Sequence, residues 1–443
     1  MDTLTAARAQ MEVSLGFHMV FAALGIGMPL LMVIAEALHL RTGAPHYRDI
    51  ARTWGKVTAL LFVVGAVSGT ALSFELGLLW PRFMAMAGSA IGPAFALEGY
   101  AFFLEAIFVG LYLYGWERLS PRAHLLCGIP VAVSGLASGA IVVGANAWMQ
   151  VPHGFDRVVD GKLVGLDPWA PFGGAWLRMA VHSSLACYAA VGFAVAGVYA
   201  VGMLRGRRNR YHRSALVIAM TVGTLAAALQ PLSGDRLAKG TARDQPAKLA
   251  AAEAHFETMR GAPIVLGGWP DPATGTVSYG VRVPKVLSFL ATGDVDGEVV
   301  GLNDFARENR PNPRVVHLAF DTMVGCGMAM LLAGALFFFV AWRRRGVDVR
   351  WSLLVVALAS PLGMLALEAG WMVTEAGRQP WAIYGLLRTR DAVTRSGDVG
   401  LTFWLFTALY LGLGATLTVL LRRAAAHSEH APPSLRGGVD VAR

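Results

Sequence analysis

The sequence is poor in cysteine and in charged residues. Its 443 residues include three cysteines, and 15% are Asp, Glu, Lys or Arg, against 55% hydrophobic residues. None of Cys127, Cys187 and Cys326 stands in CxxC spacing, so neither a disulfide framework nor a zinc or iron–sulfur site is expected. With a mean hydropathy of +0.51, the composition excludes an ordinary soluble domain and indicates an integral membrane protein.

A cleavable signal peptide is not expected either. The N-terminus lacks a basic stretch, and its first apolar run is long enough to span a membrane. Nine such runs predict an all-α polytopic membrane protein with nine transmembrane helices. The runs lie at 13–38, 57–80, 94–116, 125–148, 176–203, 214–232, 315–342, 352–375 and 400–421.

Basic residues cluster in alternate short loops, at 41–56, 118–122, 205–213, 343–350 and 422–423. The positive-inside rule makes these loops cytoplasmic, which predicts an outer, periplasmic N-terminus and a cytoplasmic C-terminus. The formal charge of +9 is then a signal of membrane topology, and no nucleic-acid partner is expected.

One long hydrophilic insert, 233–314, separates the sixth and seventh apolar runs and contains no spanning segment. Loops of this length usually have a function or a substructure of their own. We therefore predict four regions: helices one to six over 1–232, an outer loop over 233–314, helices seven to nine over 315–423, and a disordered cytoplasmic tail over 424–443.

Ligand-type side chains lie inside five of the predicted helices. Such residues are energetically costly in a membrane and therefore indicate function. At about 1.5 Å rise per residue, each lies roughly 8–18 Å below the outer surface, so the helices bring these residues to one stratum of the bilayer. The residues are His18, Glu98, Glu105, His182, Met323 and Glu368.

Each of these residues alone has a simpler explanation. His18 alone is explained equally well as a helix–helix hydrogen-bond partner or as a ligand. Met323 alone is explained by core packing, because a flexible thioether fills gaps. The buried glutamates could serve a cofactor-free proton or cation transporter, which is the alternative function; its expected marks, repeats or broken helices, are not evident. Jointly, two histidines, a methionine and three carboxylates favour axial haem ligation over copper, zinc, calcium or magnesium.

The segment EAGRQPW at 375–381 follows the eighth predicted helix. Pro380 prevents the helix from resuming, and Trp381 suits the membrane interface. Arg378 would either hold a haem propionate by charge-assisted hydrogen bonds or lie among lipid headgroups, and the spacing favours neither.

Three stretches resemble subunit I of the cytochrome bd-type quinol oxidases: EGYAFFLE at 98–105, ANAWMQ at 145–150 and EAGWMVTEAGRQPW at 368–381. The resemblance covers nearly the whole chain. It implies an enzyme of the bacterial cytoplasmic (inner) membrane that oxidises quinol at the outer face and reduces O2 to water with cytoplasmic protons. Proton motive force then arises without pumping. The implied partners are a second large membrane subunit (subunit II), quinol, O2 and lipid, with room for small single-helix subunits.

The same resemblance implies haem ligands. His182 and Met323 correspond to the axial ligands of a low-spin haem b. His18, Glu98 and Glu368 correspond to the ligand set of two high-spin haems, of which one is a haem b and the other a haem d or a third haem b. Which of the three residues serves which of these haems stays open.

Further roles follow from the resemblance. Glu105 corresponds to a proton-relay acid. Ser138 and Asn146 correspond to positions along the same proton route. Arg8, Arg378 and Trp381 correspond to positions at the cofactor, where the two arginines would lie near haem propionates.

The stretch DQPAKLAAAE at 244–253 resembles a quinol-binding loop of the short type, and membership of the cyanide-insensitive subgroup stays open. Lys248 and Glu253 correspond to its charged pair, and a carboxylate there would accept a quinol proton as a general base. From the residues alone, a short amphipathic surface helix explains this stretch equally well. Two departures from the family stand out: Asp321, where many relatives carry Arg, and Met364, where relatives often have Trp.

Overall fold

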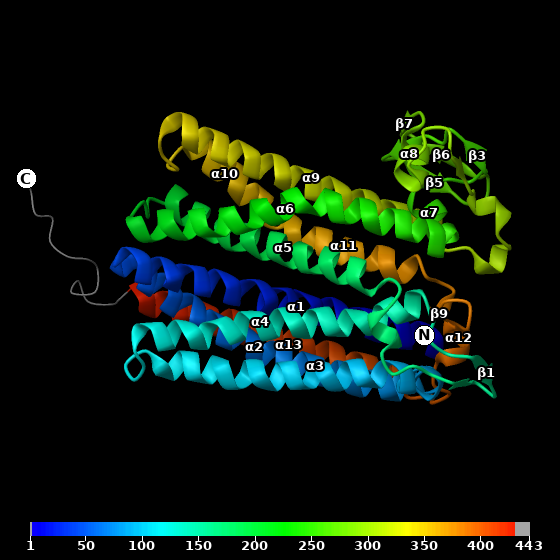
Figure 1. The fold of residues 1–443 in the computed structure, drawn as a ribbon, viewed down its shortest axis with the longest axis horizontal. Coiled ribbons are helices and arrows are strands. Elements are labelled where there is room, and N and C mark those ends of the chain that lie inside the picture. Colours follow the sequence, from blue (N-terminus) through cyan, green and yellow to red (C-terminus); the bar gives the residue numbers. More distant parts are fainter. Residues whose placement is uncertain (1, 430–443) are drawn as a thin grey trace, which may run out of the picture.

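The computed structural model describes residues 2–429 and shows a bundle of long, roughly aligned helices (Figure 1). Nine segments of this described part are long and apolar enough to cross a membrane, which confirms the predicted fold class. These spans comprise α1 (Thr3–Thr42), α2 (Pro45–Leu79), α3 (Pro81–Gly115), α4 (Pro121–Gln150), α5 (Trp176–Leu204), α6 (Arg210–Asp244), α9 (Pro313–Arg344), α10 (Arg350–Ala359) with α11 (Leu362–Ala376), and α13 (Val399–Glu429).

Short elements gather at the end of the bundle where α1 begins, opposite the end where α13 ends (Figure 1). The strands form five two-stranded antiparallel pairs, β1–β2, β3–β8, β4–β7, β5–β6 and β9–β10. The elements are β1 (Arg157–Val159), β2 (Lys162–Val164), η1 (Ala170–Phe172), α7 (Pro246–Ala252), β3 (Met259–Arg260), β4 (Ile264–Leu266), β5 (Trp269–Asp271), β6 (Thr276–Ser278), β7 (Val281–Val283), α8 (Val286–Thr292), β8 (Glu298–Val299), η2 (Leu302–Asp304), η3 (Arg307–Asn309), β9 (Trp381–Ile383), β10 (Leu387–Arg388) and α12 (Thr389–Ala392).

Two predicted boundaries are wrong. The sixth helix does not end at 232 but continues to Asp244, so the hydrophilic insert begins with α7. Hydropathy falls after 232 because the helix acquires charged side chains, yet Leu, Ala, Lys and Arg remain good helix formers. Likewise α13 continues to Glu429, so the first six residues of the predicted tail are helical, and 430–443 lies outside the described residues.

The eighth span is broken, which the sequence prediction missed. Helix α10 ends at Ala359 and α11 begins at Leu362. Pro361 lies at the break, where its missing N–H and its ring interrupt the helical hydrogen bonds. The Ser360 hydroxyl donates to Ala357 O at 2.8 Å. Helix α11 carries the carboxyls of Glu368 and Glu375.

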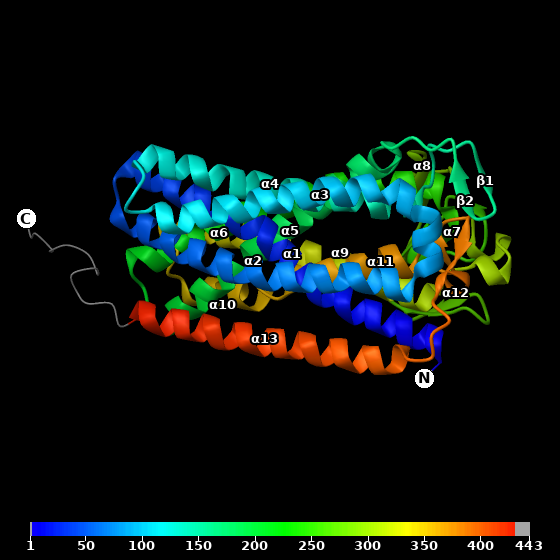
Figure 2. The ribbon, with the colours of Figure 1, turned by 90° about the horizontal axis from the view of Figure 1, so that it is seen from below.

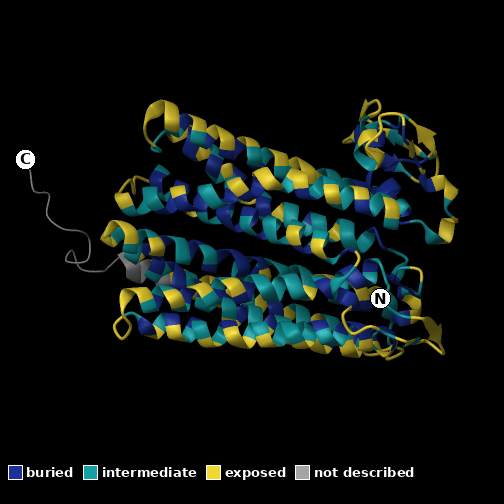
Figure 3. Ribbon diagram, in the orientation of Figure 1, coloured by how far each residue is buried: buried dark blue, intermediate teal, exposed yellow. Residues whose placement is uncertain are grey.

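The largest core lies between α1, α2, α5, α6, α9 and α10. In the most apolar stretch of α5, 67% of residues are buried, against 11% in α13. Helix α5 is therefore central, whereas α13 runs along one flank of the bundle (Figure 2). The burial colouring shows the same gradient, with exposed residues on the outer helix faces and the loops (Figure 3).

Helices α5 and α6 approach each other closely at Gly192. A Cβ atom there would lie 2.5 Å from the Gly223 backbone, so the two helices would have to separate. We expect Gly192→Ala to lower the free energy of unfolding by about 1–3 kcal/mol, as for other overpacked core positions. Gly25→Ala is the matched control, because nothing lies within 4 Å of a Cβ atom at that position. Equal thermal unfolding midpoints for the two variants in detergent would contradict this packing.

Candidate haem and quinol sites

His18 is held by a serine on the neighbouring helix. Its Nδ1 lies 2.9 Å from Ser68 Oγ, and the Ser68 hydroxyl itself donates to Gly65 O at 3.0 Å. Because the hydroxyl proton is used there, Ser68 accepts from His18 Nδ1–H, which leaves the lone pair on Nε2. A Cβ atom on Gly69 would lie 2.9 Å from His18 Cε1, so only glycine lets the ring lie this close to α2.

His182 repeats this arrangement between α5 and α6. Its Nδ1 lies 2.9 Å from Ser233 Oγ, which donates to Gln230 O at 2.9 Å. The lone pair is therefore again on Nε2, the form in which an imidazole binds a metal. The Gln230 amide donates to His182 O at 3.2 Å and lies 3.5 Å from Nε2, the outer limit of a hydrogen bond.

Two further candidates lie at the contacts of helix α11 with its neighbours. Glu368 faces α1, since a Cβ atom on Gly16 would lie 3.5 Å from its Oε2, and its Oε1 is buried without a hydrogen-bond partner. Met323 of α9 faces α11, because a Cβ atom on Gly370 would lie 2.9 Å from the thioether sulfur. The sequence candidates on α1, α9 and α11 thus lie at helix–helix contacts rather than on the lipid face.

The two glutamates of α3 both face α4. Glu98 accepts a hydrogen bond from Ser138 Oγ at 2.9 Å. Glu105 is 5% exposed, and its two carboxylate oxygens would lie 3.3 and 3.4 Å from a Cβ atom on Gly135. Glu98 and Glu105 therefore lie on one face of α3, but Ser138 is hydrogen-bonded to Glu98 rather than to Glu105.

Asn146 lies two turns further along α4, in a different group. Its amide donates to Glu375 Oε1 at 2.6 Å, and Arg378 Nη2 donates to Glu375 Oε2 at 2.5 Å. Arg378 is 3% exposed, which rules out the alternative of an arginine among lipid headgroups. Its Nη1 is buried without a partner. Neither hydrogen bond involves Glu105, to whose route Asn146 was predicted to belong.

The predicted quinol-loop lysine joins this group from α7. Lys248 Nζ donates to Gln150 Oε1 and to Thr374 O, both at 3.0 Å. Gln150 in turn donates to Asn146 Oδ1 at 3.1 Å. Burial, and secondarily the Arg378 charge, lowers the pKa of Lys248 to about 7. A hydrogen-bonded chain therefore connects the loop to the end of α11.

Glu253 caps the C-terminal end of α7 and is 4% exposed. Burial, and secondarily the charge of Asp321, raises its pKa to about 8. Residues Ala247 to Ala252 of α7 are also buried, so the alternative of a surface amphipathic helix is wrong. Lys248 bonds to α4 and α11 rather than to Glu253, so no ion pair joins the two predicted partners among the described residues.

Two other predicted cofactor residues lie at the same end of the bundle. Arg8 is exposed near the start of α1 and has no hydrogen bond or ion pair with the part of the chain that the structure describes. The Trp381 carbonyl accepts from Arg378 Nε at 3.2 Å, and its ring lies 4.9 Å from the Arg388 guanidinium. Trp381 therefore positions Arg378 through its backbone.

This donor set fits haem. Two histidines keep Nε2 for a metal, Glu368 has a buried carboxylate oxygen without a partner, and Arg378 has a buried N–H group without one. Within residues 2–429, no three His, Cys, Asp or Glu side chains converge to bind a bare ion. Sites with one or two axial donors and an arginine suit a porphyrin, which supplies the equatorial ligands and the propionates itself.

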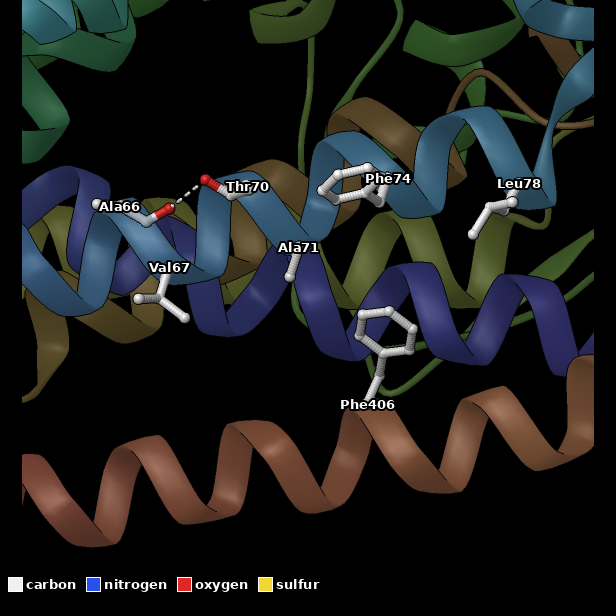
Figure 4. Close-up of a pocket in the computed structure, with 7 residues that line it drawn as sticks. All are labelled: Ala66, Val67, Thr70, Ala71, Phe74, Leu78 and Phe406. Carbon is white, nitrogen blue, oxygen red and sulfur yellow. Dashed lines mark hydrogen bonds between the residues drawn. The ribbon is translucent and has the colours of Figure 1, made fainter.

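The groove in Figure 4 has a different character. It has a volume of about 610 Å³ and lies between α2 and α13. Its one polar side chain, Thr70, donates to Ala66 O at 2.9 Å, so the groove offers no iron ligand. The groove is lined by Ala66, Val67, Thr70, Ala71, Phe74, Leu78 and Phe406.

Several site residues were missed by the sequence prediction. Ser68 and Ser233 set the histidine tautomers, and Gln150 and Glu375 complete the chain from Lys248 to Arg378. Glu375 stands in the quoted EAGRQPW, seven residues and so about two turns after Glu368, and that spacing was an available signal. The partners of the serines and of Gln150 leave no mark in the local sequence.

Comparison with known proteins identifies the family. The chain matches the model of cytochrome bd terminal oxidase subunit I over residues 6–429. A Bacillus subtilis (strain 168) protein provisionally named cytochrome bd menaquinol oxidase subunit I is 38% identical over 429 residues, 95% of this chain and 96% of that protein. Cytochrome bd ubiquinol oxidase subunit 1 of the same organism is 30% identical over 451 residues, 97% of this chain and 96% of that protein.

A solved structure agrees with the sequence relatives. The bd oxidase from Geobacillus thermodenitrificans superimposes with a TM-score of 0.92 at 36% identity, covering 96% of this chain and 99% of that chain. This chain therefore belongs to the cytochrome bd terminal oxidase subunit I family. The predicted resemblance is confirmed, and the chain is a multi-pass protein of the bacterial cytoplasmic membrane.

Proposed function

We propose that this chain is the haem-bearing catalytic subunit of a bd-type quinol:O2 oxidoreductase, acting with a second large membrane subunit. The observation that carries the proposal is the pair of membrane histidines, each with Nδ1–H bonded to a serine and Nε2 kept for a metal, in a chain of this family. The break between α10 and α11 is a mark expected of the transporter alternative, but the family match over residues 6–429 supports the oxidase.

The residues divide into ligands and cofactor-positioning groups. His182 and Met323 would hold a low-spin haem b, and His18, Glu98 and Glu368 would serve two high-spin haems. Arg8 and Arg378 would bind propionates, with Trp381 holding Arg378 in place. When bound, the haems carry single electrons and supply the iron at which O2 is reduced. Mass analysis of extracted haems distinguishes haem d from a third haem b.

Glu375 is a second carboxyl on α11 that competes with Glu368 for a ligand role. Its two oxygens are bonded to Asn146 and Arg378, whereas Glu368 has an oxygen without a partner. We therefore propose that Glu368 is the ligand of a haem iron and that Glu375 orients Arg378. Spectra of Glu368→Gln and Glu375→Gln separate these roles, because only loss of the ligand removes a high-spin signal.

The quinol would bind at the outer end, against α7. Glu253 would accept a quinol proton as a general base, and Lys248, held by Gln150 and Thr374, would orient the quinol oxygen. Oxidation of two quinols releases four protons and four electrons, which balance the reduction of one O2 to two waters with four protons from the other side. If the basic loops are cytoplasmic, as the positive-inside rule predicts, this separation charges the membrane without a pump.

The test of the function uses the purified two-subunit complex. We expect haem bands in the reduced-minus-oxidised spectrum and O2 consumption that depends on added quinol. Absence of haem bands would overturn the proposal. Mass spectrometry of the same complex reveals any small single-helix subunit.

Glu105 is expected to limit proton delivery rather than quinol binding. We expect Glu105→Gln to lower kcat about 100-fold, within the range for loss of a proton-transfer group, with the quinol KM little changed. Glu117→Gln is the control, because this carboxyl is exposed beyond the end of α3 and pairs with Arg52. Quinol-dependent O2 consumption measures both variants, and an equal kcat for the two would remove Glu105 from the proton route.

A further inference from the structure

His317, near the start of α9, is fully buried, and none of the roles above uses it. Its two ring nitrogens both face backbone carbonyl oxygens. Nδ1 lies 2.8 Å from Ala252 O, and Nε2 lies 3.1 Å from Gly267 O. A single buried side chain thereby joins three parts of the outer region: α9, the end of α7, and the turn between β4 and β5.

The two carbonyl partners make His317 a link between backbone segments. An imidazole N–H donates to a carbonyl oxygen, and each ring nitrogen of His317 lies within hydrogen-bond distance of one. Asp321, one turn further along α9, lies beside the same ring, with its Oδ2 3.4 Å from Nε2.

Asp321 also contributes to the attachment. The same Oδ2 accepts from Gly267 N at 2.7 Å, so Gly267 is held through both its carbonyl and its amide. The residue has φ +66, which glycine adopts without strain. Asp321 therefore binds the turn through the Gly267 amide, beside the ring of His317.

We propose that His317 and Asp321 form a hydrogen-bonded clasp that positions α7 and Glu253 for quinol oxidation. The clasp holds the carbonyl of Ala252, the residue before Glu253 and four residues after Lys248. This inference rests on the proposed function, because it assigns a positioning role at the quinol site. Neither clasp residue needs to touch the quinol.

The kinetic test compares variants of the intact two-subunit oxidase. His317→Gln removes the imidazole that faces both carbonyl oxygens, and we expect the quinol KM to rise about fivefold or more, as for loss of one to two buried hydrogen bonds. We expect kcat and the haem spectrum to change little, and O2 consumption with a small one-electron dye donor to be unaffected. An unchanged quinol KM, or a fall in kcat and dye-dependent activity alone, would overturn the clasp.

A double-mutant cycle tests whether the two residues act together. Asp321→Asn replaces the carboxylate that accepts from Gly267 N by an amide oxygen, which accepts more weakly, so its KM should also rise. Because the two residues act as one unit, the double variant should resemble His317→Gln rather than show the product of the two effects. Thr258→Ala is the matched control: it removes the hydroxyl bonds to Asp304 and Gly301 N, leaves both clasp residues in place, and should leave KM unchanged. If the effects of His317→Gln and Asp321→Asn on the quinol KM multiply in the double variant, the pairing is wrong. A Thr258→Ala variant whose KM rises equally would also contradict it.

Amide hydrogen exchange tests the clasp independently of the enzyme activity. In His317→Gln, the segment 247–255 should exchange faster than in the wild type, whereas α5 should not. If the wild-type complex has no quinol oxidase activity but this difference is found, the proposed function fails and the clasp stands as a structural attachment. If exchange in 247–255 is unchanged in both His317→Gln and Asp321→Asn, the clasp itself is wrong.

Discussion

Replacing His182 with alanine is expected to abolish the low-spin haem b absorption and to lower quinol-dependent O2 consumption at least about 100-fold. His182 is the imidazole that we propose as a ligand of this haem, with its Nδ1 bonded to Ser233 of α6, and alanine leaves no donor atom. Met323→Ala should remove the same signal, because a low-spin haem needs both axial ligands. The high-spin signals should persist, since His18 and Glu368 lie on other helices.

The control for this experiment is Ser233→Ala. This variant keeps the imidazole but removes the acceptor for its Nδ1–H, 2.9 Å away. Loss of such an outer partner typically weakens metal binding about 10- to 100-fold, so the low-spin signal should be reduced rather than absent. If the low-spin signal survives in both His182→Ala and Met323→Ala, the ligand assignment is wrong.

Replacing Glu253 with glutamine is expected to lower kcat for quinol oxidation about 100- to 10,000-fold, the usual contribution of a general base. Glutamine is nearly the same size and leaves the packing of α7 intact, so quinol KM should change much less. Glu257→Gln, at an exposed carboxyl four residues on, is the matched control. Equal rates for the two variants would show that Glu253 does not accept the proton.

The pH profile gives a second measurement of the same residue. Burial raises the pKa of Glu253 to about 8, so the carboxylate that accepts a proton is scarce below that pH. The quinol kcat/KM of the wild type should therefore rise about tenfold per pH unit below 8 and level off above it. Glu253→Gln should lose this rise while Glu257→Gln keeps it. A wild-type profile that falls between pH 6 and 8 would contradict the assignment.

Much of the fold was predictable because it depends on local composition. A membrane of about 30 Å needs about 20 consecutive apolar residues per helix, so nine such runs indicate nine spans. Helix ends were less predictable where polar residues continue a helix beyond the hydrocarbon, as in α6 to Asp244. The break at Pro361 was also missed, because the hydropathy of the eighth run continues through it.

The site was predictable in its residue types but not in its partners. His18, His182 and Glu105 stand out in sequence because a polar side chain in a membrane helix is costly. Ser138 and Asn146 were assigned to one route on resemblance, yet they bond to Glu98 and Glu375 respectively. A hydroxyl or an amide can serve many acceptors, and only the packing of helices selects one.

The sequence by itself determined that this protein spans the membrane nine times and to which family it belongs, and the single depth of its ligand-type residues stays a prediction. Only the tertiary structure decided that Arg378 is buried against Glu375, that α7 is buried, and that His317 joins α9 to both α7 and the β4–β5 turn. The reason is physical. Burial in a membrane is an average over a segment and is encoded in its composition, whereas each hydrogen bond depends on two groups far apart in the chain being brought within about 3 Å.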